Sequence, residues 1–333
     1  MAQPARALEV ALDPSLGPED ELPHPPSPEH ESWQESWFWD WHDARGERAG
    51  HCRFGVHPNQ GRAWLWLYLL GGSEWVALDE PRLPLAGPTA PRVAWEGFGL
   101  RLAFDSREPL RAGRLQVEGI GRVLSGPRAG RLLPLGVDLS LEGSGPARAR
   151  GPGRVGGPGA GGFVANRYEQ ASQVSGRLRL GGSEHPFQGC GGSEHSWGPR
   201  SWNLEWEHLT LQLPGGRVQA SVTRIPEVGR LATGLLEGEP PVPLADVDLE
   251  LEYRDSDLAR AVSGRVALRG KDGSAISGRL ESIAAADLDI THVLAPHQRS
   301  VCRRTLVRFW PRRRGWRKPA ACVGWLESNR FVD

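Results

Sequence analysis

Lysine is nearly absent from this chain of 333 residues. Its 40 basic residues are 38 arginines and only two lysines, Lys271 and Lys318, and 40 acidic residues balance them. A balanced charge creates no long-range field that would attract nucleic acid or an anionic surface. The composition therefore argues against a nucleic-acid partner.

Cysteine and long apolar segments are also scarce. The start of the chain is interrupted by Pro4, Arg6 and Glu9, so it lacks the apolar core of a signal peptide, and no apolar run approaches the roughly 20 residues that span a bilayer. We expect a cytoplasmic protein without an integral membrane segment, for which transient membrane contact and the oligomeric state stay open. Four scattered cysteines are too few for a disulfide framework or a zinc site, and we expect reduced, buried thiols at Cys52, Cys190, Cys302 and Cys322.

The sequence does have strand patterning and abundant tryptophan. Tryptophan recurs at every second position from Trp37 to Trp41, and aromatic residues do so from Trp64 to Tyr68. This is the period of a strand, and two such stripes can pair across a sheet. The 14 tryptophans indicate an aromatic-lined interior. We expect burial at Trp37, Trp39, Trp64 and Trp66, with Trp39 and Trp64 contacting a bound ligand.

Short strands separated by glycine and proline continue along the chain, and helical periodicity is nearly absent. Such a pattern is typical of antiparallel barrels and sandwiches. We predict further strands at residues 92–104, 110–124, 137–141, 168–180, 184–189, 203–213, 216–223, 247–254, 261–269, 275–283, 300–310 and 320–327.

Residues 143–162 contain nine glycines and three prolines. Because no sheet core can be built from this composition, we predict a linker here. It would join an N-terminal β domain at 31–142 to a C-terminal β domain at 163–333, after an extended or disordered lead-in at 1–30. The predicted fold is all-β, with two tandem lipocalin-like antiparallel barrels or sandwiches. A closed barrel can hold one small ligand.

The most unusual segment is 189–202, Gly-Cys-Gly-Gly-Ser-Glu-His-Ser-Trp-Gly-Pro-Arg-Ser-Trp. Its glycines and proline allow tight turns and close backbone approach, so we expect a strand end and corner. His195 and Trp197 share a face of a regular strand, whereas Glu194 points to the opposite face unless a bulge brings it round. We expect Glu194 to fix the tautomer of His195.

Residues 194–202 resemble the Asp-His-x-Trp-Gly-x-Arg-x-Trp signature of the carotenoid hydratase (hydroxyneurosporene synthase) superfamily, with Glu194 in place of Asp. That superfamily is lipocalin-like and includes tocopherol cyclase-like and lipid-carrier relatives. The resemblance implies that His195 and Trp197 belong to its site. It covers roughly residues 30 to 330 and extends to Tyr168-Glu-Gln170, Glu35-Ser-Trp-Phe38, 53–61 and Gly324-Trp-Leu-Glu-Ser-Asn-Arg330.

Two interpretations of the motif stay open. In one, the tryptophans plug a barrel end and His195 is a hydrogen-bonded core residue. In the other, the residues line an apolar cavity, where a desolvated acid can protonate an alkene and aromatic faces stabilise the cation. The catalytic candidates are then Glu194, His195 and Trp197, and the ligand-binding candidates are Tyr168, Trp197, Arg200 and Trp202.

Two weaker signals do not change this interpretation. His185, Cys190 and His195 match no pattern of metal ligands, and we expect neither a metal nor another cofactor. The arginine-rich stretch 299–318 with interleaved aromatics is compatible with a nucleic-acid groove, but a hairpin with a solvated basic turn explains it better.

Two classes of function follow. The first, which we favour from sequence, is a binding module that carries a hydrophobic terpenoid, polyketide or lipid unchanged. The alternative is a metal-independent hydratase, cyclase or isomerase that acts on an alkene of such a ligand. The fold serves both, and an acid placed inside the cavity would favour the enzyme.

Overall fold

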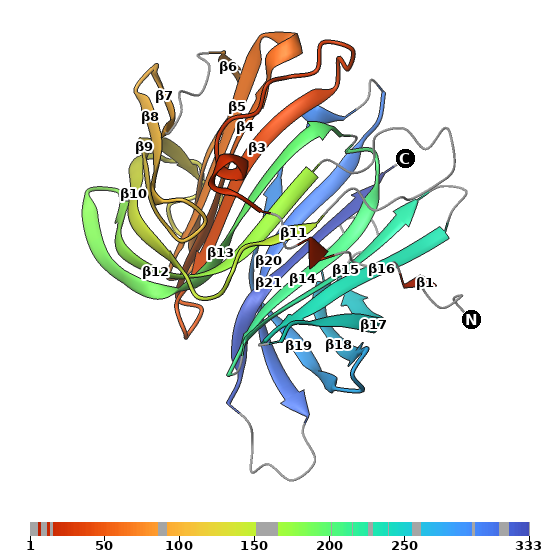
Figure 1. The fold of residues 1–333 in the computed structure, drawn as a ribbon. Coiled ribbons are helices and arrows are strands. Elements are labelled where there is room, and N and C mark those ends of the chain that lie inside the picture. The colour runs from red at the N-terminus through yellow and green to blue at the C-terminus, as the bar shows by residue number, and fades with distance from the viewer. Residues whose placement is uncertain are drawn as a thin grey trace. The chain divides into compact units, whose positions relative to one another are not determined.

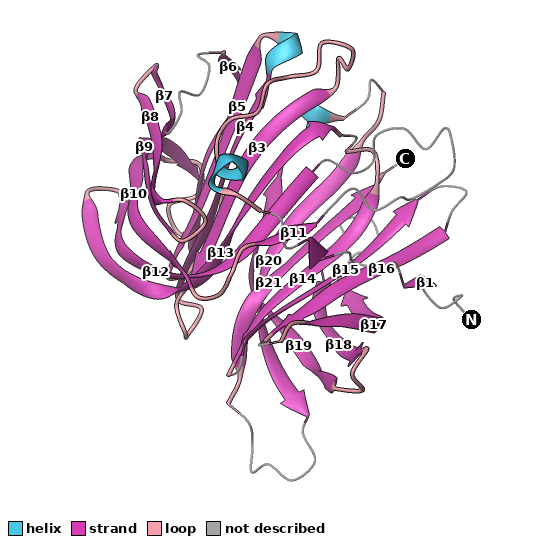
Figure 2. Cartoon of the chain, in the orientation of Figure 1, coloured by secondary structure: helices cyan, strands magenta, loops and turns pink. Residues whose placement is uncertain are grey.

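In the computed structural model the chain divides into two compact units, the N-terminal unit (Ala11–Arg200) and the C-terminal unit (Met1–Val10 with Ser201–Asp333). Each contains one large sheet (Figure 1). Apart from three short 3-10 turns, the described residues form strands and their connections (Figure 2), which confirms the all-β class. The structure describes residues 6–7, 12–13, 16–85, 92–150, 166–200, 202–214, 216–225, 229–238, 240–254, 261–294, 297–312 and 320–332. Within these ranges, no helix has the length and apolar character needed to cross a membrane.

The sheet of the N-terminal unit closes on itself. Antiparallel pairing runs from β3 through β4, β5, β6, β9, β10, β12 and β13 and returns to β3. The hairpin β7–β8 extends from β9, and β11 and β2 extend from β12. Two 3-10 turns, η1 (Pro18–Glu21) and η2 (Pro58–Gln60), belong to this unit. Its strands are β2 (Leu12–Asp13), β3 (Trp33–His42), β4 (Arg48–His57), β5 (Arg62–Gly71), β6 (Glu74–Pro84), β7 (Arg92–Gly97), β8 (Leu100–Glu108), β9 (Ala112–Val123), β10 (Leu132–Gly143), β11 (Arg148–Arg150), β12 (Asn166–Leu180) and β13 (Ser183–Pro199).

The sheet of the C-terminal unit is an up-and-down barrel. Each strand from β14 to β21 pairs with the next along the chain, and β21 returns to β14. β1 (Arg6–Ala7) adds a short parallel pairing to β16. A third 3-10 turn is η3 (Thr291–Val293). The barrel strands are β14 (Glu205–Leu213), β15 (Gly216–Ile225), β16 (Gly229–Glu237), β17 (Val242–Tyr253), β18 (Ala261–Gly270), β19 (Ala275–Leu288), β20 (Ser300–Arg312) and β21 (Cys322–Phe331).

Alternate side chains of each strand form the apolar core of its sheet. In the N-terminal unit this core contains Trp37, Trp39 and Trp41 of β3 and the leucines Leu65, Leu67 and Leu69 of β5. In the C-terminal unit it contains Leu209, Val222 and Phe309, among others. All four tryptophans that we expected to be buried are buried: Trp37, Trp39, Trp64 and Trp66.

The two aromatic stripes lie on opposite faces, which differs from the prediction that they pair. β4, which the sequence did not indicate, lies between β3 and β5. Because the core takes the leucines of β5, Trp64 and Trp66 point to the other face, where their rings lie 4.6 Å apart. Strand periodicity reports that a stripe shares a face, but not which face the core occupies.

Other differences concern strand boundaries. Residues 92–104, predicted as one strand, form the hairpin β7–β8 with a turn at Phe98 and Gly99. Strands β6 and β16 were also not predicted, because Pro84 and the glycines of β16 weaken the alternation.

The predicted domain boundary differs from the observed division. β12 pairs with β10 and β13 pairs with β3, so residues 166–200 belong to the sheet that begins at β3. The division falls after Arg200 instead of within 143–162. The glycine-rich segment is an insertion between strands of one sheet and not a linker between domains. Its composition could not show this, because glycine content does not reveal whether the strands on either side belong to the same sheet. Of the predicted linker, residues 151–162 lie outside the described part of the chain.

A nick in this insertion tests the pairing. With a protease site engineered between residues 155 and 156, we expect the two cleaved pieces to remain together in native size-exclusion chromatography. The hydrogen bonds of β12 and β13 to β10 and β3 hold them in one sheet. Release of the piece from 156 to 333 as a separate folded species would contradict the observed strand order.

Candidate functional site

The motif that the sequence predicted as a corner is part of a continuous strand. β13 runs from Ser183 to Pro199 and pairs without a register shift to β12 on one side and to β3 on the other. Its glycines serve close backbone approach, since a Cβ at Gly191 would collide with the carbonyl oxygen of Asp40. The corner predicted at the glycines is therefore wrong, and the strand ends only at Pro199, near the end of the predicted stretch. Close approach was one of the two roles expected for these glycines.

A cluster of polar side chains lies where β13 and β3 run side by side. The register pairs His195 with Trp37 and Trp197 with Glu35. Glu35 Oε1 lies 2.9 Å from His195 Nε2 and 2.8 Å from His24 Nδ1. The backbone N–H of His24 also donates to Glu35 Oε1, at 3.0 Å. His195 and Glu35 are each 1% exposed, whereas His24 is partly exposed. In this His24–Glu35–His195 cluster, the His195–Glu35 pair is therefore shielded from solvent and His24 lies at its outer edge.

The second nitrogen of His195 fixes the state of the ring. Nδ1 lies 2.8 Å from the carbonyl oxygen of Asp20. A carbonyl can only accept, so Nδ1 carries a proton. Nε2 faces Glu35 Oε1, and one further proton must lie between them. The pair is therefore either an imidazolium with a carboxylate or a neutral imidazole with a carboxylic acid.

Aromatic rings surround the cluster. The Trp37 ring stacks on His195 at 4.7 Å between centroids, and the Tyr168 ring meets His195 edge-on at 5.6 Å. Trp197 stacks on His24 at 3.9 Å with an interplanar angle of 6°. Trp37 also belongs to the apolar core of the unit. The charged pair thus lies at the boundary between that core and the N-terminal segment 17–24.

Electrostatics favour the ionised form of Glu35. Burial alone would raise the pKa of its carboxyl group, but hydrogen bonds from His195 and His24 outweigh burial and lower that pKa. Burial raises the pKa of Tyr168 well above its usual value, and nearby carboxylates reinforce the shift. Burial also raises the pKa of Glu21, against hydrogen bonds from Ser106 and Leu110. An ionised Glu35 makes His195 an imidazolium, because both of its nitrogens then face acceptors.

The lowered pKa of Glu35 predicts a pH dependence of stability. A carboxyl group whose pKa is lower in the folded state stabilises the fold above its unfolded pKa, and that contribution is lost as pH falls through the folded pKa. Replacing Glu35 by Gln removes this contribution. We expect the melting temperature of E35Q to change less than that of the wild type between about pH 5 and about pH 3. Parallel curves for the two proteins in thermal melts would contradict the lowered pKa.

Glu194 does not take the role predicted for it. In the regular strand it points to the face opposite His195, where Arg53 Nη2 lies 3.1 Å and Arg167 Nη2 3.4 Å from its carboxylate. Without a bulge in β13, Glu194 cannot reach the imidazole. Glu35 of the neighbouring strand occupies the position that Glu194 was expected to fill.

The remaining predicted residues separate into two groups. Tyr168 and Trp197 lie in the cluster with His195, whereas Trp39 packs against Phe104 in the core and Trp64 lies on the opposite face. Arg200 Nη1 lies 3.4 Å from the Ser196 hydroxyl, also on the Glu194 face. Trp202 belongs to the C-terminal unit and packs near Trp206.

Sequence reasoning missed Glu35 and His24, and only one of them carried a signal. Glu35 is two residues before Trp37 and so shares its face, and it stands within a segment that already resembled the superfamily. His24 lies in the lead-in, which was predicted to be extended or disordered. Residues 16–30 of that lead-in instead include η1 and contact Glu35. The proline content of the segment predicted disorder. Prolines exclude a regular strand, but they do not prevent an irregular segment from being held in one conformation by contacts with the sheet.

The same three side chains form a set that could bind a metal ion. His24, Glu35 and His195 offer two imidazole nitrogens and a carboxylate oxygen within 4.8 Å of one another, which is a donor set that suits zinc. The hydrogen bond from His195 Nδ1 to a carbonyl also orients metal-bound imidazoles. The three residues considered from the sequence, His185, Cys190 and His195, cannot bind one metal ion together. His185 and His195 are ten residues apart on one strand, which is a distance of about 33 Å.

Comparison with solved structures shows the same fold in other proteins. A protein assigned as AttH from Nitrosomonas europaea aligns with a TM-score of 0.61 at 15% identity, over 96% of this chain and 99% of that one. Kievitone hydratase from Nectria haematococca aligns with 0.61 at 12% identity, over 98% and 97%. CghA with Sch210972 aligns with 0.52 at 13% identity, over 91% and 89%.

No curated protein matches the chain. A family model does, over residues 17–332, which includes the His24–Glu35–His195 cluster and nearly all of both sheets. The chain therefore belongs to the family described as a domain of unknown function, DUF7064.

Proposed function

We propose that the N-terminal unit is an acid–base catalyst of the hydratase type, which adds water to a carbon–carbon double bond of an apolar ligand. The observation that carries this proposal is the buried His195–Glu35 pair, in which one proton lies between two acceptor atoms 2.9 Å apart. Such a pair can release a proton and take one back, as the reaction requires.

The chemistry uses groups that the site contains. The proton of the pair is transferred to one alkene carbon, and the π electrons form the new C–H bond, which leaves a carbocation on the other carbon. The rings of Trp37 and Tyr168 both contact His195, so a cation formed beside the pair would lie next to aromatic side chains, which favour positive charge. Water then attacks the cation, and its surplus proton returns to the pair. The balance is alkene plus water to alcohol, with the pair regenerated.

The N-terminal segment 17–24 would have to move for a ligand to enter. Asp20 accepts the hydrogen bond of His195 Nδ1, and His24 covers Trp197 and binds Glu35. Residues 17–24 are all intermediate or exposed, whereas the strand residues beneath them are buried. A few hydrogen bonds hold the segment, including those of Glu21 with Ser106 and Leu110. Its displacement would open the His195–Glu35 pair toward solvent, and its return would exclude bulk water during the reaction.

A solved structure of similar fold belongs to an enzyme of the proposed class. That enzyme is kievitone hydratase, aligned over almost its whole length. At this low identity the likeness supports the fold, while the resemblance of the motif at His195 to the carotenoid hydratase signature supports the chemistry. Glu194, the residue that departs from that signature, does not face the proposed site.

A carrier without chemistry is the second candidate. The indole N–H groups of Trp37 and Trp41 are buried and make no hydrogen bond within the described residues. Buried donors are normally satisfied, so an oxygen of a bound ligand would complete them. This observation supports binding of an apolar molecule that carries a hydroxyl or carbonyl group, whether or not it reacts.

Copurification and deuterium exchange separate the two functions. The full chain is purified, its bound molecules are extracted and analysed by mass spectrometry, and the complex is incubated in deuterated water. We expect an alkene and its hydrated product, with deuterium incorporated at carbon. A bound ligand that stays unchanged and gains no carbon-bound deuterium would favour the carrier and reject the catalyst. Pretreatment with a chelator should leave the exchange rate unchanged, and its loss would indicate metal chemistry instead.

A further inference from the structure

The large apolar side chains that are exposed gather on one part of the N-terminal unit. Within the described residues, those most exposed are Phe98 at 87%, Leu132 at 61%, Ile120 at 56% and Leu124 at 42%. Ile120 belongs to β9, Leu132 begins β10, and Leu124 follows the end of β9. Clustered exposed apolar residues indicate an interaction site more strongly than scattered ones.

Strand register places these side chains on one face. Ile120 pairs with Pro134, and Arg122 pairs with Leu132. Ile120, Arg122 and Leu124 alternate with core residues and so point outward together. β8 pairs Arg101 with Glu118, so the β7–β8 turn, two residues further along, lies beside Ile120. We call this group the apolar corner: Phe98, Ile120, Leu124, Leu132 and Pro134.

Phe98 has a backbone conformation that is unfavourable for a phenylalanine, and its side chain points outward. Phe98 has φ of 51° and Gly99 has φ of 75°. The left-handed region suits glycine or asparagine, and a bulky aromatic residue there is unusual. Trp95 lies 6.1 Å from the Phe98 ring, but the side chain is still almost fully exposed. Packing within the unit therefore does not account for a phenylalanine at this position.

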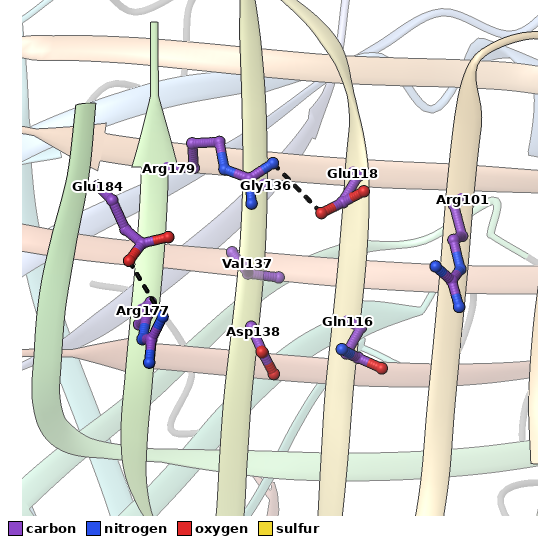
Figure 3. Close-up of a pocket in the computed structure, with 9 residues that line it drawn as sticks. All are labelled: Arg101, Gln116, Glu118, Gly136, Val137, Asp138, Arg177, Arg179 and Glu184. Atoms are coloured by element: carbon purple, nitrogen blue, oxygen red, sulfur yellow. Dashed lines mark hydrogen bonds and ion pairs between the residues drawn. The ribbon is translucent and has the colours of Figure 1, made fainter. Parts of the chain in front are cut away.

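A charged hollow lies on the outer face of the same strands (Figure 3). It adjoins the apolar corner, because Glu118 in the hollow and Ile120 in the corner are two residues apart on β9 and so share a face. One row of paired residues crosses five strands in the order Arg101, Glu118, Gly136, Arg179 and Glu184. Gly136 has no side chain, so a depression forms where Arg179 reaches across to Glu118 at 3.2 Å. Neighbouring Arg177 pairs with Glu184, also at 3.2 Å.

Three arginines around the apolar corner form no ion pair within the described residues. Arg101, Arg122 and Arg131 are exposed. Figure 3 shows Arg101 at the edge of the hollow, with no dashed line to a carboxylate. Arg122 makes only a long hydrogen bond to the Gly130 carbonyl, at 3.5 Å. Strand register places Arg101 between Glu96 and Glu118, and Glu118 also pairs with Arg179. The positive charge beside the protruding apolar groups therefore rests mainly on Arg122 and Arg131.

We propose that this surface docks the protein on a bilayer that contains anionic phospholipid. Phe98, Ile120 and Leu132 would enter the headgroup region, where aromatic and aliphatic side chains are favoured. Arg101, Arg122 and Arg131 would bind lipid phosphates, which match guanidinium geometry and charge. Charge complementarity selects this occupant over a second copy of the chain, since two such surfaces would bring like charges together. The proposal does not depend on the reaction at His195.

Vesicle sedimentation tests the proposal with the full chain. Vesicles of phosphatidylcholine alone are compared with vesicles that also contain phosphatidylglycerol. We expect binding to the anionic vesicles that weakens as salt is raised. The triple variant R101Q/R122Q/R131Q should bind them at least tenfold more weakly, since each arginine near an anionic surface contributes about fivefold. F98S/L132S should also lose at least tenfold, whereas F98L should keep most of the binding.

R45Q is the matched control, because Arg45 is an exposed arginine on the β3–β4 turn. It should bind vesicles as the wild type does, and all variants should keep the wild-type melting temperature since the altered residues are exposed. The proposal fails if the wild type does not bind anionic vesicles, or if R45Q weakens binding as much as the triple variant. It also fails if size-exclusion chromatography shows a dimer that F98S/L132S dissociates while vesicle binding is unaltered.

Discussion

Replacing Glu35 by Gln is expected to lower the rate of carbon deuteration or hydration by about 100- to 10,000-fold, the usual contribution of general acid–base catalysis. Gln keeps the shape of the side chain, but its neutral amide cannot share a proton with His195. The imidazole loses the carboxylate that makes it an imidazolium. The rate is measured with the alkene that copurifies, at saturating concentration, so that weakened binding is separated from slower chemistry.

E194Q is the matched control for this variant. Glu194 precedes His195 in the sequence but faces Arg53 and Arg167 on the other side of β13. We expect E194Q to lower the melting temperature and to leave the rate per folded molecule within about threefold of the wild type, which is under 1 kcal/mol. If E194Q lost activity and E35Q kept it, the assignment of the acid–base pair to β3 and β13 would be wrong.

Replacing Trp39 by Ala is expected to destabilise the N-terminal unit by about 3–5 kcal/mol, the usual cost of deleting a large buried aromatic side chain. Trp39 is 1% exposed and packs against Phe104 within the core cluster. Strand β3 lies between β4 and β13, so the cavity cannot be filled by moving an edge strand. Denaturant unfolding, followed through both units, measures the loss.

F98A supplies the comparison, since Phe98 is almost fully exposed. We expect a change below about 0.5 kcal/mol for it, as for most surface substitutions. A loss of less than about 1 kcal/mol for W39A would mean that the interior of this sheet is not close-packed around Trp39. In that case Trp39 would line an open cavity, as the sequence first suggested.

Period-two alternation was sufficient to predict the fold class and most strands. The stripe from Trp37 to Trp41 proved to be an inner face of β3, and the same rule placed His195 and Trp197 together. The rule did not show which face of β5 carries Trp64. Both faces of β5 are buried, so the alternation of residue types does not tell the core face from the opposite face. The rule failed for the domain boundary because pairing between β13 and β3 joins residues some 150 positions apart, and no local pattern encodes such a contact.

At the site too, the local sequence pattern identified one residue, but its partners come from distant parts of the chain. His195 was found from its motif, but its partner Glu35 comes from another strand and His24 from a proline-rich segment. Adjacent position favoured Glu194 as the partner, yet adjacency along a strand places two side chains on opposite faces. The acid–base pair could therefore be recognised only once strand register was known.

Nitrogen-15 NMR of the His195 ring tests the account most directly. The account predicts that, near neutral pH, both ring nitrogens carry protons, because Nδ1 faces the Asp20 carbonyl and Nε2 faces the Glu35 carboxylate. The two resonances would be assigned by their loss in H195Q, and in E35Q the Nε2 proton should disappear. An unprotonated Nε2 in the wild type, unchanged by E35Q or by a chelator, would contradict the imidazolium–carboxylate pair on which this account rests.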